Sequence, residues 1–441
     1  MGTVIILLQL FVVLAMIFIG AKVGGIGLGI YGMVGVFVLV FVFGLEPGSV
    51  PVDVMLIIVS VITASASLQA AGGLDYMVKV AERFLKKHPS RITFFAPLVT
   101  WLFTLLAGTA HTCYALLPII SEIARKAKVR PERPLSIATI SASLGCTGSP
   151  VSAATAAIIS EKLLGAHGIG MKEIMMVTIP SSFIAILVAS LVQNYVGKPL
   201  EQDPEYQRRL SQGLLADETE TQSESESANP HARWAVMAFL LGVVLIMLFG
   251  IFPSLRPSFN GATLEMSLTI EILMMSIAAL ILLVGKADVY QAMKGNVFAS
   301  GMNAMVSIFG VAWMGSTFFL GHEQEIMRGV NGVFSTYPML FAIPLFLFSI
   351  MLFSQAATAK TLFPVGLALG VPPTILLVLF PAVNGYFFLP NYPTSVAAIG
   401  FDRTGSTHIG KYVVNHSFQL PDWITTFVSI GVGYLIVTFL L

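Results

Sequence analysis

The chain has 441 residues, of which 56% are hydrophobic and only 11% are charged, far below the roughly 25% charged fraction of a soluble domain. Its formal net charge is +1, and it has no basic block that would neutralise a row of phosphates, which excludes nucleic acid as a partner. The two cysteines, Cys113 and Cys146, provide neither a disulfide framework nor a metal site. This composition indicates an integral membrane protein.

Long apolar windows recur along the chain. Windows of about 18–20 residues match the roughly 30 Å hydrocarbon core of a bilayer, whereas the strict alternation of a membrane β-barrel is absent. We therefore predict an all-α polytopic membrane protein with about 10–12 transmembrane segments. The first three are expected at residues 4–20, 26–43 and 53–70.

Two short loops are the most basic parts of the chain. Residues 79–91 and residues 125–133 each contain five Lys or Arg residues. The positive-inside rule predicts that both loops are cytoplasmic. Because three spans precede the first loop, the N-terminus is expected outside.

Polar turns interrupt four of the apolar segments. In residues 92–124, a break at 108–112 predicts a broken helix pair that leaves the cytoplasm and returns to it. In residues 134–160, a break at 145–152 separates two arms too short to span alone, which predicts a re-entrant hairpin. The other two breaks lie at residues 354–360 and 390–395.

One segment differs from the rest in composition. Residues 198–233 are rich in Asp, Glu, Ser and Thr, and we interpret them as a solvated, partly disordered linker. The linker separates an N-terminal membrane half, residues 1–197, from a C-terminal membrane half, residues 234–441.

The two halves share an order of features. Gly108 precedes Pro118 at the same spacing as Ser354 precedes Pro364, and in each half the next apolar segment is broken by a polar turn. Many secondary transporters are built from paired repeats with the binding site between them. The order therefore predicts two pseudo-symmetric repeats.

Lys360 is the only Asp, Glu, Lys or Arg between Arg328 and Asp402. A charge near the membrane centre costs about 2.5–3.5 kcal/mol, so this lysine indicates a functional site. Interrupted helices expose backbone N–H groups and half-helix N-termini, which suit carboxylates. We expect a pocket for a small dicarboxylate, in which Lys360 offsets substrate charge while hydroxyl and amide groups orient the carboxylates. The expected binding residues are Thr109, His111, Thr147, Ser149, Ser152, Ser354, Gln355, Thr358, Lys360, Asn384, Asn391, Thr394 and Ser395. Pro150 and Pro393 are expected to hold the tips open.

Each of these residue types also has a structural interpretation. Ser and Thr bond back to their own helix, Asn links helices, a lysine such as Lys360 snorkels to an interface, and His111 could be a satisfied structural histidine. An intramembrane hydrolase or transferase would use Ser149 with His111, and an anion channel is a further alternative. A phosphate-binding loop for ATP is absent, so uphill transport would draw on exchange or on a gradient of H⁺ or Na⁺. Neither a cofactor nor a metal is expected.

Seven segments resemble the Dcu family of anaerobic C4-dicarboxylate transporters: Val50–Met55, Leu68–Asp75, Leu106–His111, Ser354–Lys360, Leu389–Pro393, Thr407–Lys411 and Asn415–Phe418. The resemblance covers essentially the whole chain and combines features of the DcuA-like and DcuB-like branches. It implies a bacterial inner-membrane carrier that exchanges fumarate, malate or aspartate for succinate during anaerobic respiration. It also implies inverted repeats with paired re-entrant hairpins, a scaffold domain that forms a homodimer, a mobile transport domain and, in some relatives, a sensor kinase partner.

Overall fold

The computed structural model describes residues 2–23, 26–48, 50, 52–160, 163–213, 215, 229–259, 261–329, 333–352, 354–388, 392–410 and 415–441. These residues are almost entirely helical, as predicted. Seven of the described helices are long and apolar enough to cross a membrane, or eight if one bent pair counts as a span. Four shorter apolar helices accompany them, at Val4–Gly20, Gly27–Val42, Pro338–Ile350 and Pro373–Phe387.

The described residues of the first half form nine α-helices. They are α1 (Gly2–Val23), α2 (Gly27–Phe37), α3 (Val52–Ala70), α4 (Gly73–Lys87), α5 (Ile92–Ala107), α6 (Cys113–Lys126), α7 (Glu132–Gly148), α8 (Ala153–Ile159) and α9 (Met171–Gln193). A π-helical turn, η1 (Val38–Val42), extends α2, and the short 3-10 turns are η2 (Pro89–Arg91), η3 (Ala110–Thr112) and η4 (Leu164–His167). The bent pair is α3 and α4, which meet at 70°.

The linker and the second half contain the remaining elements. The linker begins with η5 (Leu200–Gln202) and α10 (Pro204–Ser211). The second half has α11 (Ala232–Ile251), η6 (Pro253–Leu255), β1 (Ser258–Phe259), β2 (Ala262–Thr263), α12 (Met266–Gly285), α13 (Val289–Lys294), α14 (Asn296–Gly329), α15 (Val333–Thr336), η7 (Pro338–Phe341), α16 (Ala342–Leu352), α17 (Gln355–Ala368), α18 (Pro373–Val378), η8 (Phe380–Phe387), α19 (Pro393–Phe401) and α20 (Gln419–Leu440). The two strands pair antiparallel, with Ser258 opposite Thr263.

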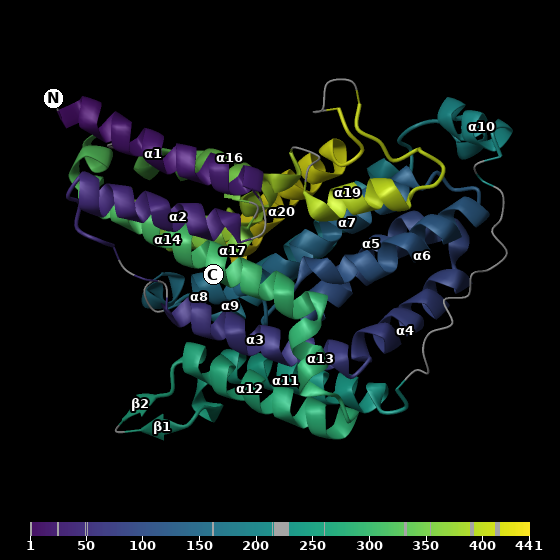
Figure 1. Ribbon diagram of the computed structural model, residues 1–441, viewed down its shortest axis with the longest axis horizontal. Coiled ribbons are helices and arrows are strands. Elements are labelled where there is room, and N and C mark those ends of the chain that lie inside the picture. Colours follow the sequence, from purple (N-terminus) through teal and green to yellow (C-terminus); the bar gives the residue numbers. More distant parts are fainter. Residues whose placement is uncertain are drawn as a thin grey trace.

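The helix α7 forms the centre of the molecule. Every one of its residues except Arg133 is buried, although it carries five Ser or Thr residues. A helix buried on all sides belongs to the interior of a bundle. In Figure 1, α1 and α2 lie at the left of the view, α5, α6 and α7 at the right, and α11 and α12 at the bottom.

The helices α5 and α6 turn back on each other, as predicted for residues 92–124. The backbone of Trp101 and the side chain of Thr104 face Gly145, and Leu105 faces Gly148, so α5 and α7 run in the same direction. The intervening helix α6 must therefore run the opposite way, and it packs against η2 at the start of α5. The break at 108–112 is the tip of this hairpin.

The helices α7 and α8 differ from the prediction. Together they form one apolar span, Glu132–Ile159, whose two parts continue in nearly the same direction. Beyond the break, α8 packs against α3, α12 and α17 rather than folding back along α7. The structure thus replaces the re-entrant hairpin predicted for residues 134–160 by a broken helix that continues across the bundle.

In the second half, α16 ends at Leu352 and α17, with an internal Pro364, begins at Gln355. Residues 355–360, predicted as part of a break, are therefore helical. The elements α18, η8 and α19 follow. The halves exchange contacts, because α8 packs against α17 and α19 packs against α6. Ser121 of α6 also donates a hydrogen bond to the carbonyl oxygen of Phe401, at 3.0 Å.

The first part of the linker is folded against the membrane halves rather than solvated throughout, which corrects the sequence-based interpretation. Asp203 is buried because it pairs with Arg130, which precedes α7. Its carboxylate also caps α10 by accepting hydrogen bonds from the N–H groups of Glu205 and Tyr206, at 2.9 and 3.0 Å. Figure 1 shows α10 at the opposite end of the molecule from the β1–β2 hairpin.

Candidate functional site

The two breaks of the first half lie against each other. Gly108 ends α5 with a left-handed φ of 72°, and a Cβ at this position would lie 2.5 Å from the carbonyl oxygen of Val151. Only glycine meets both conditions without strain. The tip at 108–112 therefore packs directly on the break between α7 and α8.

A small cavity of about 90 Å³ lies beside this contact. Gly108, Thr109 and Val151 form one wall, and the other wall comes from α3 and α14. Ser65 of α3 lines it, and the Ser65 hydroxyl is buried with no hydrogen-bond partner among the described residues. Ser65 was not among the predicted binding residues, although Ser or Thr recurs at positions 60, 63, 65 and 67.

Several predicted binding residues of the first half stabilise the break itself. The Ser152 hydroxyl caps α8 by accepting from the Thr155 N–H at 3.1 Å, and it donates to the carbonyl oxygen of Cys146 at 2.6 Å. Thr147 donates back to the Leu144 carbonyl oxygen at 2.9 Å. The Ser149 hydroxyl accepts from the Val151 N–H at 3.3 Å. In this structure, these hydroxyls satisfy backbone groups that the break exposes.

The predicted amides of the second half meet at α7. The Gln355 side chain donates to the carbonyl oxygen of Ser143 at 2.8 Å, to the amide oxygen of Asn384 and to the Tyr386 hydroxyl at 3.3 Å. Gln355 and Asn384 are buried. This cluster joins α17 and η8 to the central helix, so the two amides are brought together with the first half.

Ser354 and Thr358 stabilise the N-terminal end of α17. The Ser354 hydroxyl caps the helix by accepting from the Ala357 N–H at 3.2 Å, and Thr358 donates to the Ser354 carbonyl oxygen at 2.8 Å. Lys360 follows on the same helix with a partly exposed side chain.

The last predicted residues follow the second break. Thr394 and Ser395 lie in the first turn of α19, and their hydroxyls are buried without a partner among the described residues. Asn391 and the side chains of His111 and Pro393 lie outside the described part of the chain. Pro150 lies, as predicted, in the turn between α7 and α8.

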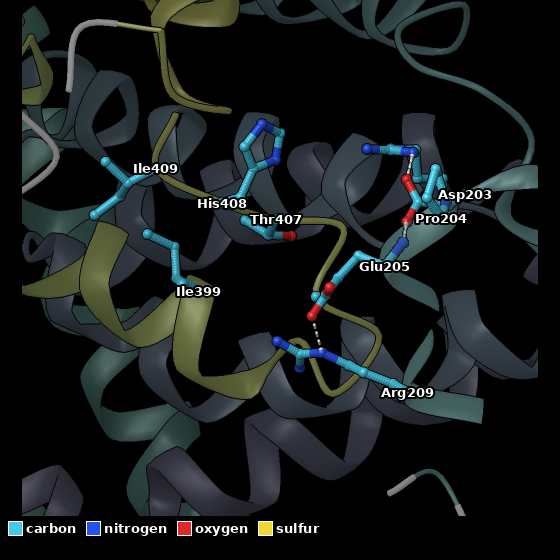
Figure 2. Close-up of a pocket in the computed structure, with 10 residues that line it drawn as sticks. Asp203, Pro204, Glu205, Arg209, Ile399, Thr407, His408 and Ile409 are labelled. Carbon is cyan, nitrogen blue, oxygen red and sulfur yellow. Dashed lines mark hydrogen bonds and ion pairs between the residues drawn. The ribbon is translucent and has the colours of Figure 1, made fainter. Parts of the chain in front are cut away.

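A second, larger cavity of about 660 Å³ opens at the end of the molecule that carries the linker (Figure 2). Figure 2 shows Asp203, Glu205 and Arg209 of the linker on one side and Thr407 and His408 on the other. Its charges pair within the wall: Arg130 with Asp203, and Arg209 with Glu205 at 2.7 Å. A wall whose charges are already neutralised gives a dianion little electrostatic attraction.

Burial and hydrogen bonding set the charge of these linker carboxyls. Burial alone would raise the pKa of Asp203, but the Tyr206 N–H and Arg130 lower it below its ordinary value. Hydrogen bonds from Arg208 and Arg209 lower the pKa of Glu205 to about 2. Both groups are therefore anionic at neutral pH.

The family model for anaerobic C4-dicarboxylate membrane transporters, DcuA_DcuB, matches residues 5–441. The chain belongs to this family. It is 41% identical over 438 residues to the anaerobic C4-dicarboxylate transporter DcuB of Escherichia coli O6:H1, with 97% of each protein covered. It is 40% identical over 434 residues to DcuA of Wolinella succinogenes and 41% identical over 440 residues to DcuA of Escherichia coli K12, covering 98% of this chain and 99% of each relative.

Membership of the Dcu family decides between the transporter and the enzyme that the sequence left open. The family consists of membrane transporters, so the hydrolase or transferase alternative built on Ser149 and His111 is set aside. The resemblance seen in the sequence is confirmed. The apolar helices and the family together make the chain a multi-pass inner-membrane transporter.

Proposed function

We propose that this Dcu protein exchanges C4-dicarboxylates, such as fumarate, malate or aspartate for succinate, by alternating access. The structural observation that carries the proposal is the cavity at the first break, which Thr109 of the α5–α6 tip and Ser65 of α3 both line. Its volume is small beside the roughly 300–1,000 Å³ of pockets for drug-sized ligands, as suits a four-carbon substrate. Movement of α5, α7 and α8 relative to α3 and α14 would open it.

The two halves act as repeats in this proposal. The hairpin α5–α6 and the broken span α7–α8 correspond to the pair α16–α17 and the broken segment from α18 to α19. The exchange of contacts between α8 and α17 and between α19 and α6 supports the correspondence. Each half thus contributes one hairpin break and one broken helix, and substrate binds between the halves.

Substrate recognition would use polar groups at the breaks and beside them. The hydroxyls of Ser65, Thr394 and Ser395 are buried without partners among the described residues, which makes them available as donors to carboxylate oxygens. Thr109 adds a half-buried hydroxyl at the first break, and Lys360 offsets one carboxylate charge. The Gln355–Asn384 cluster would hold α17 in place.

We assign the basic end of the molecule to the cytoplasm. The linker lies at this end, because Lys128 pairs with Glu201 and Arg133 donates to the carbonyl oxygen of Val196. The positive-inside rule then places the first part of the linker inside the cell and the N-terminus outside.

A homodimer and a sensor kinase partner are supported by the family resemblance. Light scattering of the purified protein in detergent would reveal a dimer as a doubled protein mass. Co-purification with a co-expressed kinase would test the second partner.

The substrate class is tested by competition in proteoliposomes. Uptake of labelled succinate should saturate, and it should be inhibited by fumarate and malate but much less by malonate or glutarate, which have the wrong chain length. Linear uptake without competition would support a channel and contradict the proposal.

A further inference from the structure

Asp422 is a buried acid inside the membrane region that the substrate site does not use. It lies in the first turn of α20, where its side chain is 2% exposed. Its Oδ1 atom has no hydrogen-bond partner among the described residues. Acidic residues within membrane spans are costly and mark functional positions by default.

The surroundings of Asp422 are polar but uncharged. The hydroxyls of Thr426 and Ser429, one and two turns further along α20, are also buried without partners in the described part of the chain. On α9, which packs along α20, the same holds for the Ser190 hydroxyl and for the Gln193 side-chain oxygen. A buried carboxyl on a helix interface with further unpaired polar atoms calls for an explanation, and a proton bound to the carboxyl is one.

No cation among the described residues compensates the carboxyl. The described elements packed on α20 are α7, α9, α18, η8 and, through Phe346, α16, and neither α16 nor α18 has a titratable residue. Their titratable or charged residues are Glu132, Arg133 and Cys146 on α7, Lys172 and Glu173 on α9, and Tyr386 on η8. Glu132 is held by Arg130 and by the Ser417 hydroxyl at 2.6 Å, and Lys172 and Glu173 are at the far end of α9, beyond the contact of Val177 with Gly433. Among the residues that the structure describes, Tyr386 interacts electrostatically with Asp422, and no cationic side chain does.

The start of α20 contacts Phe346 of α16 and Phe388, the residue that precedes the second break. Trp423 stacks on Phe346 of α16 with ring centroids 4.8 Å apart and meets Phe388 edge to face at 6.1 Å. His416, which precedes α20, bonds the Phe388 carbonyl oxygen at 2.9 Å. Phe388 is the last described residue before the second break, so these contacts place the start of α20 next to the proposed substrate site.

We propose that Asp422 is a proton-binding site whose occupancy controls dicarboxylate binding at the second break. This proposal rests on the proposed function. One O–H bond forms at the carboxyl when the proton binds, and the negative charge is removed. The anionic form repels a dianionic substrate in a medium of low dielectric constant, and the neutral form does not. Proton binding and substrate binding therefore favour each other.

The test is the pH dependence of succinate affinity in the purified full-length protein. Isothermal titration from about pH 6.5 to 8.5, where succinate stays a dianion, should show affinity falling with rising pH, by at most about tenfold per pH unit for one linked proton. Asp422→Asn, which mimics the neutral form, should bind at high pH as well as the original protein does at low pH. Asp422→Glu, which keeps the carboxyl, should retain the pH dependence.

Proton uptake provides a second readout that does not depend on a variant folding. Succinate added to the original protein in weakly buffered solution should raise the pH, and this rise should be absent with Asp422→Asn. Three results would overturn the proton site. The pH dependence of succinate affinity could be unchanged in Asp422→Asn, or the original protein could show none. Succinate accumulation could also be driven by Na⁺ at constant pH and be lost in Asp422→Asn. If the original protein exchanges succinate normally in these cases, only this proposal fails; if it neither binds nor exchanges succinate, the proposed function fails with it.

Discussion

At Gly108, the left-handed backbone and the close packing both require a residue without a side chain. We predict that Gly108→Ala abolishes transport, because its Cβ costs about 1–2 kcal/mol in the left-handed region and also displaces Val151 at the neighbouring break. Gly44 is the matched control, since its φ of 73° is equally left-handed but a Cβ would meet nothing within 4 Å. Labelled succinate uptake should be lost in Gly108→Ala and retained in Gly44→Ala. Equal uptake by both would show that the contact between the breaks is unimportant.

Lys360 is predicted to act through its charge. Replacing it by Gln removes a charge-assisted hydrogen bond, which is worth about 1.5–3 kcal/mol, so succinate affinity should fall by about 10- to 100-fold. Lys360→Arg keeps the charge and should retain part of the affinity. Saturation curves for succinate uptake give the half-saturation concentrations of Lys360→Gln and Lys360→Arg. An unchanged half-saturation concentration in Lys360→Gln would contradict the charge role.

Sequence reasoning identified residues at the breaks better than it identified what those residues do. Ser152 and Ser354 were predicted as ligands because hydroxyls follow a break, yet the first need of a broken helix is to cap its new N-terminus, and both serve as caps here. Gln355 and Asn384 were both predicted to line the pocket, but a hydrogen bond between them was not predicted. Ser65 was missed because its helix has no break, and only tertiary packing brings α3 against Thr109.

At the scale of elements, the ionic contacts around Arg130 join the linker to both halves. Arg130 pairs with Glu132 and Asp203, and the Glu132 N–H donates to the Ser406 hydroxyl at 3.0 Å. Arg130→Met would leave buried carboxylates unpaired, and we expect a loss of about 3–5 kcal/mol in the free energy of unfolding. Lys128→Met is the control, because its pair with Glu201 is exposed and worth little. Thermal unfolding in detergent should show a large drop in Tm only for Arg130→Met.

The pH dependence of this linker contact follows from its carboxyls. The pKa values of Asp203 and Glu205 are lowered on folding, so their contribution to stability is present above the ordinary pKa of a carboxyl group. It is lost as the pH falls towards about 2, the folded pKa of Glu205. Protease cleavage of the linker near α10 should therefore be unchanged between pH 8 and pH 5 and rise only in stronger acid. Cleavage that increases on going from pH 8 to pH 6 would contradict this assignment.

The elements themselves were predictable where they are long and apolar. The helical spans and the turn at 108–112 follow from hydropathy and from the paired basic loops. The direction of the chain after residues 145–152 could not be predicted, because two short apolar arms around a Pro-containing turn fit a hairpin and a broken helix equally well. The contacts of α8 with α3 and α12 decide for the broken helix, and such contacts are long-range.

At the scale of the whole molecule, the two halves enclose one polar centre. The buried helix α7 carries Ser143, to which the second half is bonded through Gln355, and α8 and α19 each pack on the hairpin of the other half. A carrier that alternates between two sides needs such mutual contacts, because movement in one half must be transmitted to the other. The family match identifies a C4-dicarboxylate transporter, and exchange by alternating access is our proposal for how it works.

Counterflow tests that claim most directly. Proteoliposomes that contain the purified protein and a high concentration of unlabelled fumarate are diluted into a trace of labelled succinate. Exchange predicts that label transiently accumulates inside above its external concentration, and that the overshoot disappears when internal fumarate is omitted. Label that rises only to equilibrium, at the same rate with and without internal fumarate, would contradict exchange.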